Sequence, residues 1–367
     1  MRVLHILNEL KPSGAEIMLE LAAPGWRELG GDLHILSVAQ SRGPHAARLE
    51  QAGWTIHLFD CRAGRLGVIG ALARAIRQIG PDVVHIHSER RILPNCLAVW
   101  RCGIPMFRTV HNNFLFGGRL RQQKKLERLI CRRLGLRHIA ISTSVQSNEL
   151  QRFANPSQVC WNWFDARRFQ PPTAEEKIAA RQRLGLPADR PILVSIGNGS
   201  DVKNYAAIIG ALADPRHRSL LYCQVGLPHP GGRDQALATQ HQLGERVRFC
   251  GPQDNVLDWL WACDLYVMPS LYEGLSLAAA EALAAGCHCL FASSPGLVDF
   301  QEFGVTAGWA DPTPAGVAEA IGQSLANPLT ESVLHRNSEL IREALAVDVG
   351  SRAYFDLWVS AAHNSAR

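Results

Sequence analysis

The chain has 367 residues, of which 47% are hydrophobic and 19% are charged, and its formal net charge is +5. This composition excludes a disordered chain, and the length favours two domains over one compact core. The longest uncharged run, residues 282–298, contains glycines, a proline and a histidine, so we expect no transmembrane helix. Residues 1–7 are typical of a buried strand, so we expect no signal peptide and a cytoplasmic protein whose ten scattered cysteines stay reduced.

The net charge is unevenly distributed along the chain. Residues 1–165 carry 22 Lys and Arg against 12 Asp and Glu, whereas residues 166–367 carry 16 against 21. A basic first half and an acidic second half predict two domains whose surfaces face different partners.

Short apolar runs alternate with amphipathic helical patterns throughout the first half. The predicted strands are Val3–Leu7, Leu33–Val38, Thr55–Phe59, Val83–His87, Met106–Val110 and His138–Ile141. The predicted helices between them include Ala15–Leu29, Val68–Ile79 and Leu120–Leu134. Strands that alternate with helices in this way predict a parallel sheet covered on both faces.

Residues 162–172 lose this periodicity and end in a proline pair, which indicates a linker. A second series follows, with predicted strands Ile192–Ile196, Leu220–Val225, Val247–Phe249, Leu265–Met268 and His288–Phe291. The prediction is an α/β protein of two tandem Rossmann-like domains. The expected boundaries are residues 1–163 for the first domain, 164–171 for the linker, 172–349 for the second domain and about 350–367 for a last helix.

Residues 269–286 form the most informative motif. The apolar strand 265–268 runs into a turn, and a helix of strong helix formers follows over about 276–285. Such a unit directs free backbone N–H groups and the positive end of a helix dipole to the carboxyl edge of a sheet, where an anion can bind. Glu273 and Glu281 lie eight residues apart in this unit, and an ionised carboxylate can accept from two adjacent hydroxyls at once.

In each half of the chain, a further candidate loop follows the first predicted strand. Residues 11–16 read Lys-Pro-Ser-Gly-Ala-Glu, and a small-residue turn there lets backbone N–H groups approach a phosphate or a sugar. Residues 196–204 read Ile-Gly-Asn-Gly-Ser-Asp-Val-Lys-Asn and place Lys203 just before a helix. The alternatives are a plain helix start capped by Ser13, and a surface lysine without a role.

Together these motifs resemble those of the retaining glycosyltransferases of family GT4, which have the GT-B fold. The resemblance implies an active site in the cleft between two domains, and transfer of a hexose-type sugar from a nucleoside-diphosphate donor to an acceptor hydroxyl. It also implies that the last helix, about 350–367, packs back on the first domain; a helix packed only on its own domain is the alternative. It implies that Glu273 contacts the sugar, Glu281 holds the ribose and Lys203 neutralises the diphosphate. The implied donor-binding residues are Ser13, Gly14, Gly197, Asn198, Lys203, Gln253, Glu273, Gly274, Leu275, Ser276 and Glu281, and the implied catalytic residues are Glu273, His111 and Lys203.

Two positions depart from the family pattern. Ser13 stands where the family has a glycine, and Asn198 stands where it has an arginine that neutralises the diphosphate. Losing one charge-assisted contact costs on the order of 2–4 kcal/mol of barrier. The alternatives are therefore a catalytically weakened homologue that binds donor, or a GT-B nucleotide-sugar epimerase. A dinucleotide dehydrogenase is disfavoured because no Gly-x-Gly-x-x-Gly follows any predicted strand.

Three histidines end neighbouring strands of the first half. His85 and His87 end one predicted strand and His111 ends the next, so all three are expected at the carboxyl edge of the sheet. We expect His85 and His87 to point to opposite faces, with one of them structural. A zinc site is the alternative, but no carboxylate or cysteine is placed to complete it, so we predict no metal and no cofactor.

Residues 119–138 contain eight Lys and Arg residues and one acid, Glu127. The pattern predicts a helix whose leucines pack on the sheet while its cations, Arg121, Lys124, Lys125, Arg128 and Arg132, face outward. Basic amphipathic helices bind anionic membranes with about 1 kcal/mol per nearby cation. A solvated helix is the alternative, and nucleic acid is not expected because no nucleic-acid motif accompanies the charge.

The expected partners are therefore a nucleoside-diphosphate sugar, an acceptor glycan or lipid-linked sugar, and an anionic membrane surface. These partners suit the synthesis of cell-envelope glycans. The expected location is the cytoplasm, with the inner face of the plasma membrane as the alternative.

Overall fold

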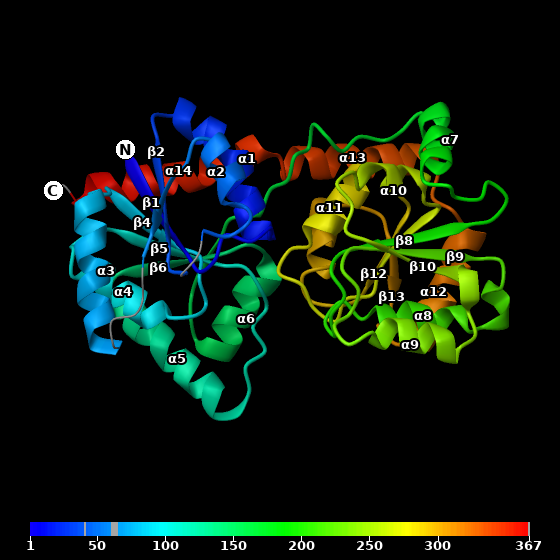
Figure 1. Ribbon diagram of the computed structural model, residues 1–367, viewed down its shortest axis with the longest axis horizontal. Coiled ribbons are helices and arrows are strands. Elements are labelled where there is room, and N and C mark those ends of the chain that lie inside the picture. Colours follow the sequence, from blue (N-terminus) through cyan, green and yellow to red (C-terminus); the bar gives the residue numbers. More distant parts are fainter. Residues whose placement is uncertain (40–41, 60–64, 366–367) are drawn as a thin grey trace. The chain divides into compact units, whose positions relative to one another are not determined.

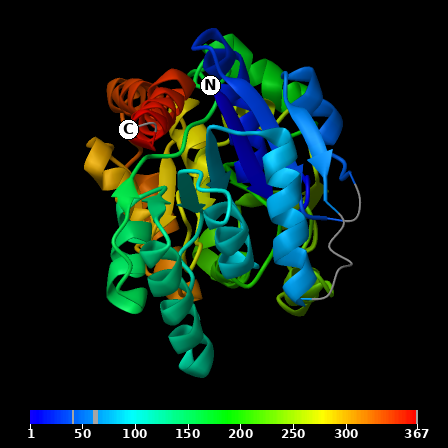
Figure 2. The same cartoon turned by 90° about the vertical axis from the view of Figure 1, so that its left-hand side faces the viewer.

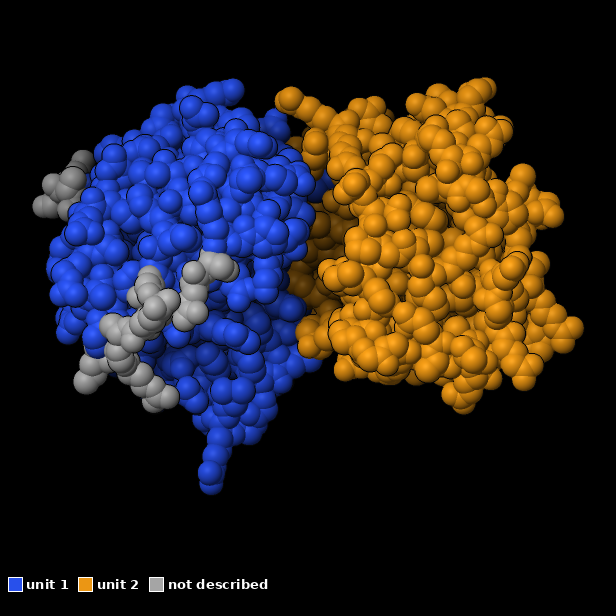
Figure 3. Space-filling view, in the orientation of Figure 1, with its two compact units in different colours: residues 1–164, 347–367 blue, residues 165–346 orange. Residues whose placement is uncertain are grey.

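The computed structural model describes residues 1–39, 42–59 and 65–365. It divides the chain into two compact units: unit 1 comprises residues 1–164 and 347–367, and unit 2 comprises residues 165–346 (Figure 3). Each unit contains one parallel sheet with helices packed against it. The predicted fold class of two Rossmann-like α/β domains is confirmed.

The sheet of unit 1 runs in the order β3-β2-β1-β4-β5-β6-β7, and every pairing is parallel (Figure 1). Its strands are β1 (Arg2–Leu7), β2 (Asp32–Ser37), β3 (Thr55–Leu58), β4 (Val83–Ile86), β5 (Met106–Val110), β6 (Leu136–Ala140) and β7 (Gln158–Val159). The strand order reverses between β1 and β4. Ligands of open α/β sheets bind at such a switch point, outside the carboxyl ends of the strands.

The helices of unit 1 are α1 (Gly14–Glu28), α2 (Ala46–Gln51), α3 (Arg65–Ile79), α4 (Ile92–Trp100), α5 (Gly118–Arg133), α6 (Thr143–Phe153) and α14 (Val347–Ser365). Alternate strand residues such as Leu4, Ile6 and Val84 share one buried cluster with α3 and α4. Residues on the other sheet face, such as His5 and His85, contact α1 and α14 instead. This alternation buries both faces of the sheet.

Helix α14 joins unit 1 although it follows all of unit 2 in the sequence. Trp26 of α1 donates from Nε1 to the Ser351 carbonyl at 2.8 Å, and Trp358 donates from Nε1 to His85 Nδ1 at 3.1 Å. The Tyr354 hydroxyl lies 3.1 Å from Thr109 Oγ1 of β5. Hydrogen bonds and large aromatic rings therefore hold this last helix to the sheet.

The sheet of unit 2 runs in the order β10-β9-β8-β11-β12-β13, again with every pairing between named strands parallel. Its strands are β8 (Ile192–Ile196), β9 (Leu221–Val225), β10 (Val247–Gly251), β11 (Leu265–Met268), β12 (Cys289–Ala292) and β13 (Gly308–Ala310). Its α-helices are α7 (Ala174–Arg183), α8 (Tyr205–Leu212), α9 (Arg233–Gln240), α10 (Leu257–Ala262), α11 (Leu277–Ala284), α12 (Pro314–Ala326) and α13 (Glu331–Ala344). Three short 3-10 helices are η1 (Pro215–His217), η2 (Gly244–Arg246) and η3 (Val298–Phe303).

Each strand predicted from the sequence is confirmed to within two residues. The prediction missed β7 and β13, which have two and three residues and are too short to show an apolar period. No described helix combines the length and the apolar composition needed to span a bilayer.

Candidate functional site

Loops at the carboxyl edge of the unit 2 sheet are joined by backbone hydrogen bonds. The Leu271 N–H donates to the Val202 carbonyl at 2.8 Å, which ties the turn after β11 to the loop after β8. The Glu273 N–H donates to the Pro295 carbonyl at 2.9 Å, which ties the same turn to the segment after β12. The sequence motifs at residues 196–204 and 269–286 therefore meet at one edge.

Glycines are required where these loops approach one another. Gly197 has φ +146°, and a Cβ there would lie 2.9 Å from the Tyr205 hydroxyl oxygen and 3.3 Å from Lys203 Cε. Gly226 has φ +128°, and a Cβ there would lie 2.3 Å from the Gly197 carbonyl oxygen. A larger residue at either position would push the loop away from the sheet edge.

Lys203 and Glu273 form an ion pair at this edge, with Nζ 2.8 Å from Oε1. The two side chains are 20% and 15% exposed, so the pair is partly shielded but reachable. Because Lys203 passes beside Gly197, its ammonium lies where the strand β8 ends. A ligand phosphate placed here would compete with Glu273 for the same cation.

The turn before α11 is buried, and Ser276 caps the helix. Its hydroxyl accepts from the Ala279 N–H at 3.4 Å, and Gly274, Leu275 and Ser276 are all buried. The amino end of α11 therefore lies at the carboxyl edge of the sheet, where its dipole favours an anion.

Glu281 lies one turn further along α11 and is partly buried. Its carboxylate makes no hydrogen bond or ion pair with the described residues. Burial raises the pKa of Glu281 to about 7, and the more distant charges of Arg168 and Asp165 act in opposite directions. A carboxyl group in this state lacks donors, and two ligand hydroxyls would supply them.

Asn198 and Gln253 have local partners. The Asn198 Oδ1 atom accepts from the Leu227 N–H at 3.0 Å, so this amide links the loops after β8 and β9. Gln253 is exposed and donates from Nε2 to the Cys250 carbonyl at 2.9 Å, beside the end of β10. Asn198 thus serves a structural contact that an arginine could not make.

Sequence reasoning missed Asn204 and Tyr205. Asn204 has φ +54° and donates from Nδ2 to the carbonyls of Pro269 and Pro312 at 3.0 and 2.8 Å. The Tyr205 hydroxyl is buried beside Gly197 and makes no hydrogen bond within the described part of the chain. An Asn just before a helix is a recognisable signal for a left-handed turn residue, whereas the tyrosine reads only as an apolar core residue.

In unit 1, Ser13 and Gly14 stand at the amino end of α1 and are exposed. The Ser13 hydroxyl donates to Glu16 and does not cap the helix backbone. Burial raises the pKa of Glu16, and the hydrogen bond from Ser13 opposes that effect. The backbone N–H groups of this first turn are therefore not used by the Ser13 side chain.

The prediction that His85 and His87 point to opposite faces is wrong. Residues two apart along a strand share a face, and these rings stack with centroids 4.6 Å apart. His5 of β1 pairs in register with His85 and joins the same group. His111, which follows β5, is half-buried and lies 2.9 Å from His87 through its Nε2 atom.

One ring nitrogen from each of His5, His85 and His87 lies within 4.8 Å of the other two, which is compatible with a metal site. His85 uses both ring nitrogens, on Trp358 and on Thr109, and His87 uses both on its histidine neighbours. A metal would have to displace these hydrogen bonds. The absence of a metal stays a prediction.

The prediction for α5 is wrong about which face packs inward. Leu126 and Leu129 are 56% and 38% exposed, whereas Arg128 is fully buried and the Lys124 side chain is 13% exposed. Arg121 and Arg132 donate to backbone carbonyls at the end of α6. Of the five cations expected to face a membrane, Lys125 alone is exposed, and its side chain makes no hydrogen bond or ion pair with the described residues.

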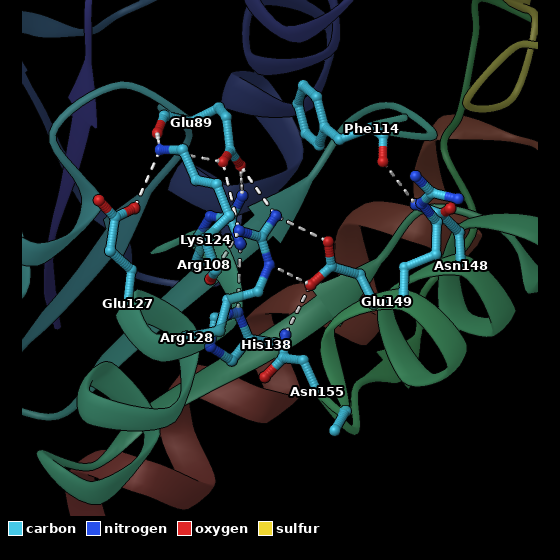
Figure 4. Close-up of polar contacts among 12 residues, drawn as sticks. Glu89, Arg108, Phe114, Lys124, Glu127, Arg128, His138, Asn148, Glu149 and Asn155 are labelled. Atoms are coloured by element: carbon cyan, nitrogen blue, oxygen red, sulfur yellow. Dashed lines mark hydrogen bonds and ion pairs between the residues drawn. The ribbon is translucent and has the colours of Figure 1, made fainter. Parts of the chain in front are cut away.

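A buried network explains this inverted packing (Figure 4). Arg128 donates to both carboxylate oxygens of Glu149, at 2.7 and 2.8 Å, and lies 3.2 Å from Glu89. Arg108 of β5 donates to the same Glu89, and Asn155 donates to Glu149 at 2.7 Å. Matched charges therefore fix α5 to the sheet and to α6, which leaves its leucines outside.

Family profiles match most of the chain. The profile described as Glycosyltransferase Family 4 matches residues 12–195, and the profile described as Glycosyl transferases group 1 matches residues 176–341. EpsF of Bacillus subtilis, which carries the name of a glycosyltransferase, is 26% identical over 309 residues, or 80% of this chain and 79% of EpsF. The D-inositol 3-phosphate glycosyltransferase of Streptomyces scabiei is 28% identical over 312 residues, or 78% and 69% of the two chains.

Solved structures share the fold over nearly the whole chain. A glycosyltransferase of Rickettsia africae gives a TM-score of 0.82 at 16% identity and covers 98% of both chains. HepE of Anabaena, crystallised with UDP and with UDP-glucose, gives 0.81 at 19% identity and covers 98% of this chain and 100% of HepE. The likeness shows two Rossmann-like domains of the GT-B type.

Proposed function

The chain belongs to glycosyltransferase family 4, and on that premise we propose that it transfers a hexose-type sugar from a nucleoside-diphosphate sugar to an acceptor hydroxyl. The transfer retains the anomeric configuration and needs no metal. The observation that carries the proposal is Glu281, a desolvated carboxyl to which no described residue donates a hydrogen bond. It lies on the helix whose amino end adjoins the Lys203–Glu273 pair. The residues of this edge match a ligand with hydroxyls at one end and a diphosphate near the other.

Each side chain has a role that its surroundings support. Glu281 accepts the two ribose hydroxyls, which relieve the cost of burying its charge. Lys203 leaves Glu273 for the diphosphate, and the first-turn N–H groups of α11 assist it. Glu273, freed from Lys203, accepts from a hydroxyl of the transferred sugar.

In the proposed reaction, stabilisation of the leaving diphosphate matters more than a strong general base. The bond between the anomeric carbon and the phosphate oxygen breaks while the acceptor oxygen bonds the same face of that carbon. The departing phosphate oxygen takes the acceptor proton, so no side chain has to become a nucleophile. Lys203 and the amides stabilise the negative charge that develops on the diphosphate.

Nucleotide binding tests the proposal directly. Thermal shift and calorimetry with UDP, GDP and ADP should show one diphosphate that stabilises the protein by mass action. UDP is the first choice because HepE, which shares the fold, was crystallised with it. Glu281→Ala should abolish the shift, whereas Glu343→Ala, at an exposed position on α13, should leave it unchanged. Equal nucleotide-induced shifts in the two variants would contradict the proposed contact between Glu281 and the ribose.

Asn198 favours a second candidate, a protein that binds donor without transferring sugar. Its amide is engaged with Leu227 and supplies no positive charge to a diphosphate. The two candidates differ in turnover: a transferase releases UDP from UDP-glucose when an acceptor is present, whereas a binder leaves the donor intact.

The inverted packing of α5 suggests the partner of unit 1. The outward face of the helix presents Leu126 and Leu129 together with Lys125 and Arg133, all of them exposed. Lys125, Leu129 and Arg133 recur at four-residue intervals and Leu126 lies three residues before Leu129, so the four side chains form one stripe. One end of α5 extends beyond the other helices of unit 1 (Figure 2). An anionic membrane that carries a lipid-linked acceptor fits both the leucines and the cations.

Vesicle binding tests this surface. Wild-type protein should co-sediment with vesicles containing phosphatidylglycerol, and the double change Leu126→Gln and Leu129→Gln should reduce the bound fraction severalfold. Leu150→Gln is the matched control, because Leu150 is an exposed leucine on the neighbouring helix α6. Unchanged binding of the double variant would exclude the outward face of α5.

A further inference from the structure

A column of three imidazoles leads from the interior of unit 1 to the carboxyl edge of its sheet. His5 Nδ1 lies 2.8 Å from His87 Nε2, and His87 Nδ1 lies 2.9 Å from His111 Nε2. The planes of adjacent rings differ by 14° and 28°. His111 directly follows β5 and forms the end of the column at the carboxyl edge of the sheet.

All three rings are neutral at pH 7. Burial lowers the pKa of each ring, and the neighbouring rings or Arg108 add to that effect; for His111 the pKa is about 4. A neutral imidazole has one N–H group and one bare nitrogen. The position of the proton on one ring therefore determines the donor and the acceptor in both hydrogen bonds.

The surroundings of His5, at the buried end of the column, determine which ring nitrogen carries the proton. The Nε2 atom of His5 is buried and has no hydrogen-bond partner among the described residues. The ring centroids of Trp26, Trp54 and Trp358 lie 5.7, 5.0 and 5.2 Å from the centroid of the His5 ring. These indoles have no N–H group to give, because they donate to the Ser351 carbonyl, the Leu19 carbonyl and His85. Aromatic rings can accept an N–H group on their faces, whereas a bare nitrogen would find no donor here. His5 therefore carries its proton on Nε2.

The tautomer of His5 fixes the tautomer of His87, which in turn fixes the tautomer of His111. His5 Nδ1 accepts from the Nε2–H of His87, so His87 Nδ1 is bare and accepts from the Nε2–H of His111. His111 Nδ1 is then a bare acceptor, and it has no partner among the residues that the structure describes.

We propose that His5 and His87 are positioning residues, which hold His111 with a bare Nδ1 that accepts a hydrogen bond from a hydroxyl of the transferred sugar. This inference rests on the proposed function for its ligand. The proton positions do not rest on it, because they follow from the surroundings of His5.

Tautomer spectra test the proton positions without any substrate. Two-bond proton–nitrogen correlation spectra of protein labelled with nitrogen-15 in its histidines report which ring nitrogen is protonated. We expect His5, His87 and His111 all to be protonated on Nε2 at pH 7, with assignments from single replacements. A His111 ring protonated on Nδ1, or on both nitrogens, overturns the inference.

Replacing His87 tests whether it acts through His111. His87→Phe keeps a flat ring but removes both hydrogen bonds, so His111 should lose its single tautomer. His87→Gln should preserve that tautomer, because an amide can accept from His111 and donate to His5. His57→Phe is the control: it breaks a similar pair, with His34 Nδ1 2.8 Å from His57 Nε2, on strands remote in sheet order from β5. An unchanged His111 spectrum in His87→Phe contradicts the positioning role.

Binding measurements then test the sugar contact. The ratio of the Kd for UDP to the Kd for UDP-glucose measures what the hexose adds. His87→Phe should reduce that ratio by about threefold to tenfold, the effect of one hydrogen bond, and leave UDP affinity unchanged. His87→Gln should restore it. An unchanged ratio with a lost tautomer overturns the sugar contact, whereas failure of the wild type to bind any nucleotide contradicts the proposed function itself.

Discussion

The two units bury carboxylates in opposite ways. In unit 1, burial raises the pKa of Glu149, but the hydrogen bonds from Arg128 and Asn155, together with the charges of Arg108 and Arg128, outweigh that effect and leave the pKa lowered. In unit 2, Glu281 has no such donor among the residues that the structure describes, and burial raises its pKa to about 7. The same type of side chain is satisfied in one unit and unsatisfied in the other.

The difference separates structural from functional polar groups. A buried carboxylate with matched cations holds helices and strands together, as Glu149 does for α5 and α6. A buried carboxyl without donors is a cost that a ligand can relieve. The Lys203–Glu273 pair lies between these cases, because it is paired yet remains accessible.

The largest effect is expected from breaking the satisfied network. Arg128→Met leaves Glu149 buried without its main partner and should lower the free energy of unfolding by about 3–5 kcal/mol, measured by urea denaturation. Lys125→Met, on the exposed side of the same helix, should change it by less than about 0.5 kcal/mol. Adding Glu149→Leu to Arg128→Met should recover most of the loss. Equal stability of the two single variants would show that the network is not structural.

A smaller and pH-dependent effect is expected at Glu281. Its pKa lies near 7 in the folded protein and near 4.5 when unfolded, so the folded state keeps a proton that the unfolded state releases between these values. Stability from this group is therefore present below pH 4.5 and is lost as pH rises to 7.

Glu281→Gln should accordingly match the wild type at pH 4 and exceed its free energy of unfolding by about 3 kcal/mol at pH 8. Chemical denaturation across this range measures the difference. Glu343→Gln, at an exposed position, should show no such trend. A constant difference between pH 4 and pH 8 would mean that Glu281 titrates normally.

The smallest effect is expected where a cation is added to the unit 2 edge. Asn198→Arg removes the bond to the Leu227 N–H and should cost about 0.5–1.5 kcal/mol of stability. The new charge should tighten UDP binding severalfold, because a second cation faces the diphosphate. Calorimetry with UDP measures the gain, and unchanged or weaker binding would place residue 198 outside reach of the phosphates.

The sequence predicted the elements far better than it predicted their contacts. Both sheets, and the strand–turn–helix around Glu273, follow from local apolar periodicity and helix propensity. Pattern reasoning failed on α5, where leucines at helical spacing were assigned to the interior and Arg128 to the surface. Apolar spacing shows which residues share one face of a helix. It does not show which face packs inward, because that depends on the partners that neighbouring elements offer to buried charged side chains.

What the sequence determined by itself is the set of strands, helices and glycine turns, because these depend on residues close together in the chain. What only the tertiary structure decided is which buried polar groups have partners. Glu89 meets Arg108 and Arg128 across a strand and a helix, and His5 meets His87 across the sheet, at separations of 19, 39 and 82 residues. No local sequence pattern encodes such contacts. Buried polar groups that have hydrogen-bond partners hold the fold together, whereas those that lack partners mark the candidate functional site.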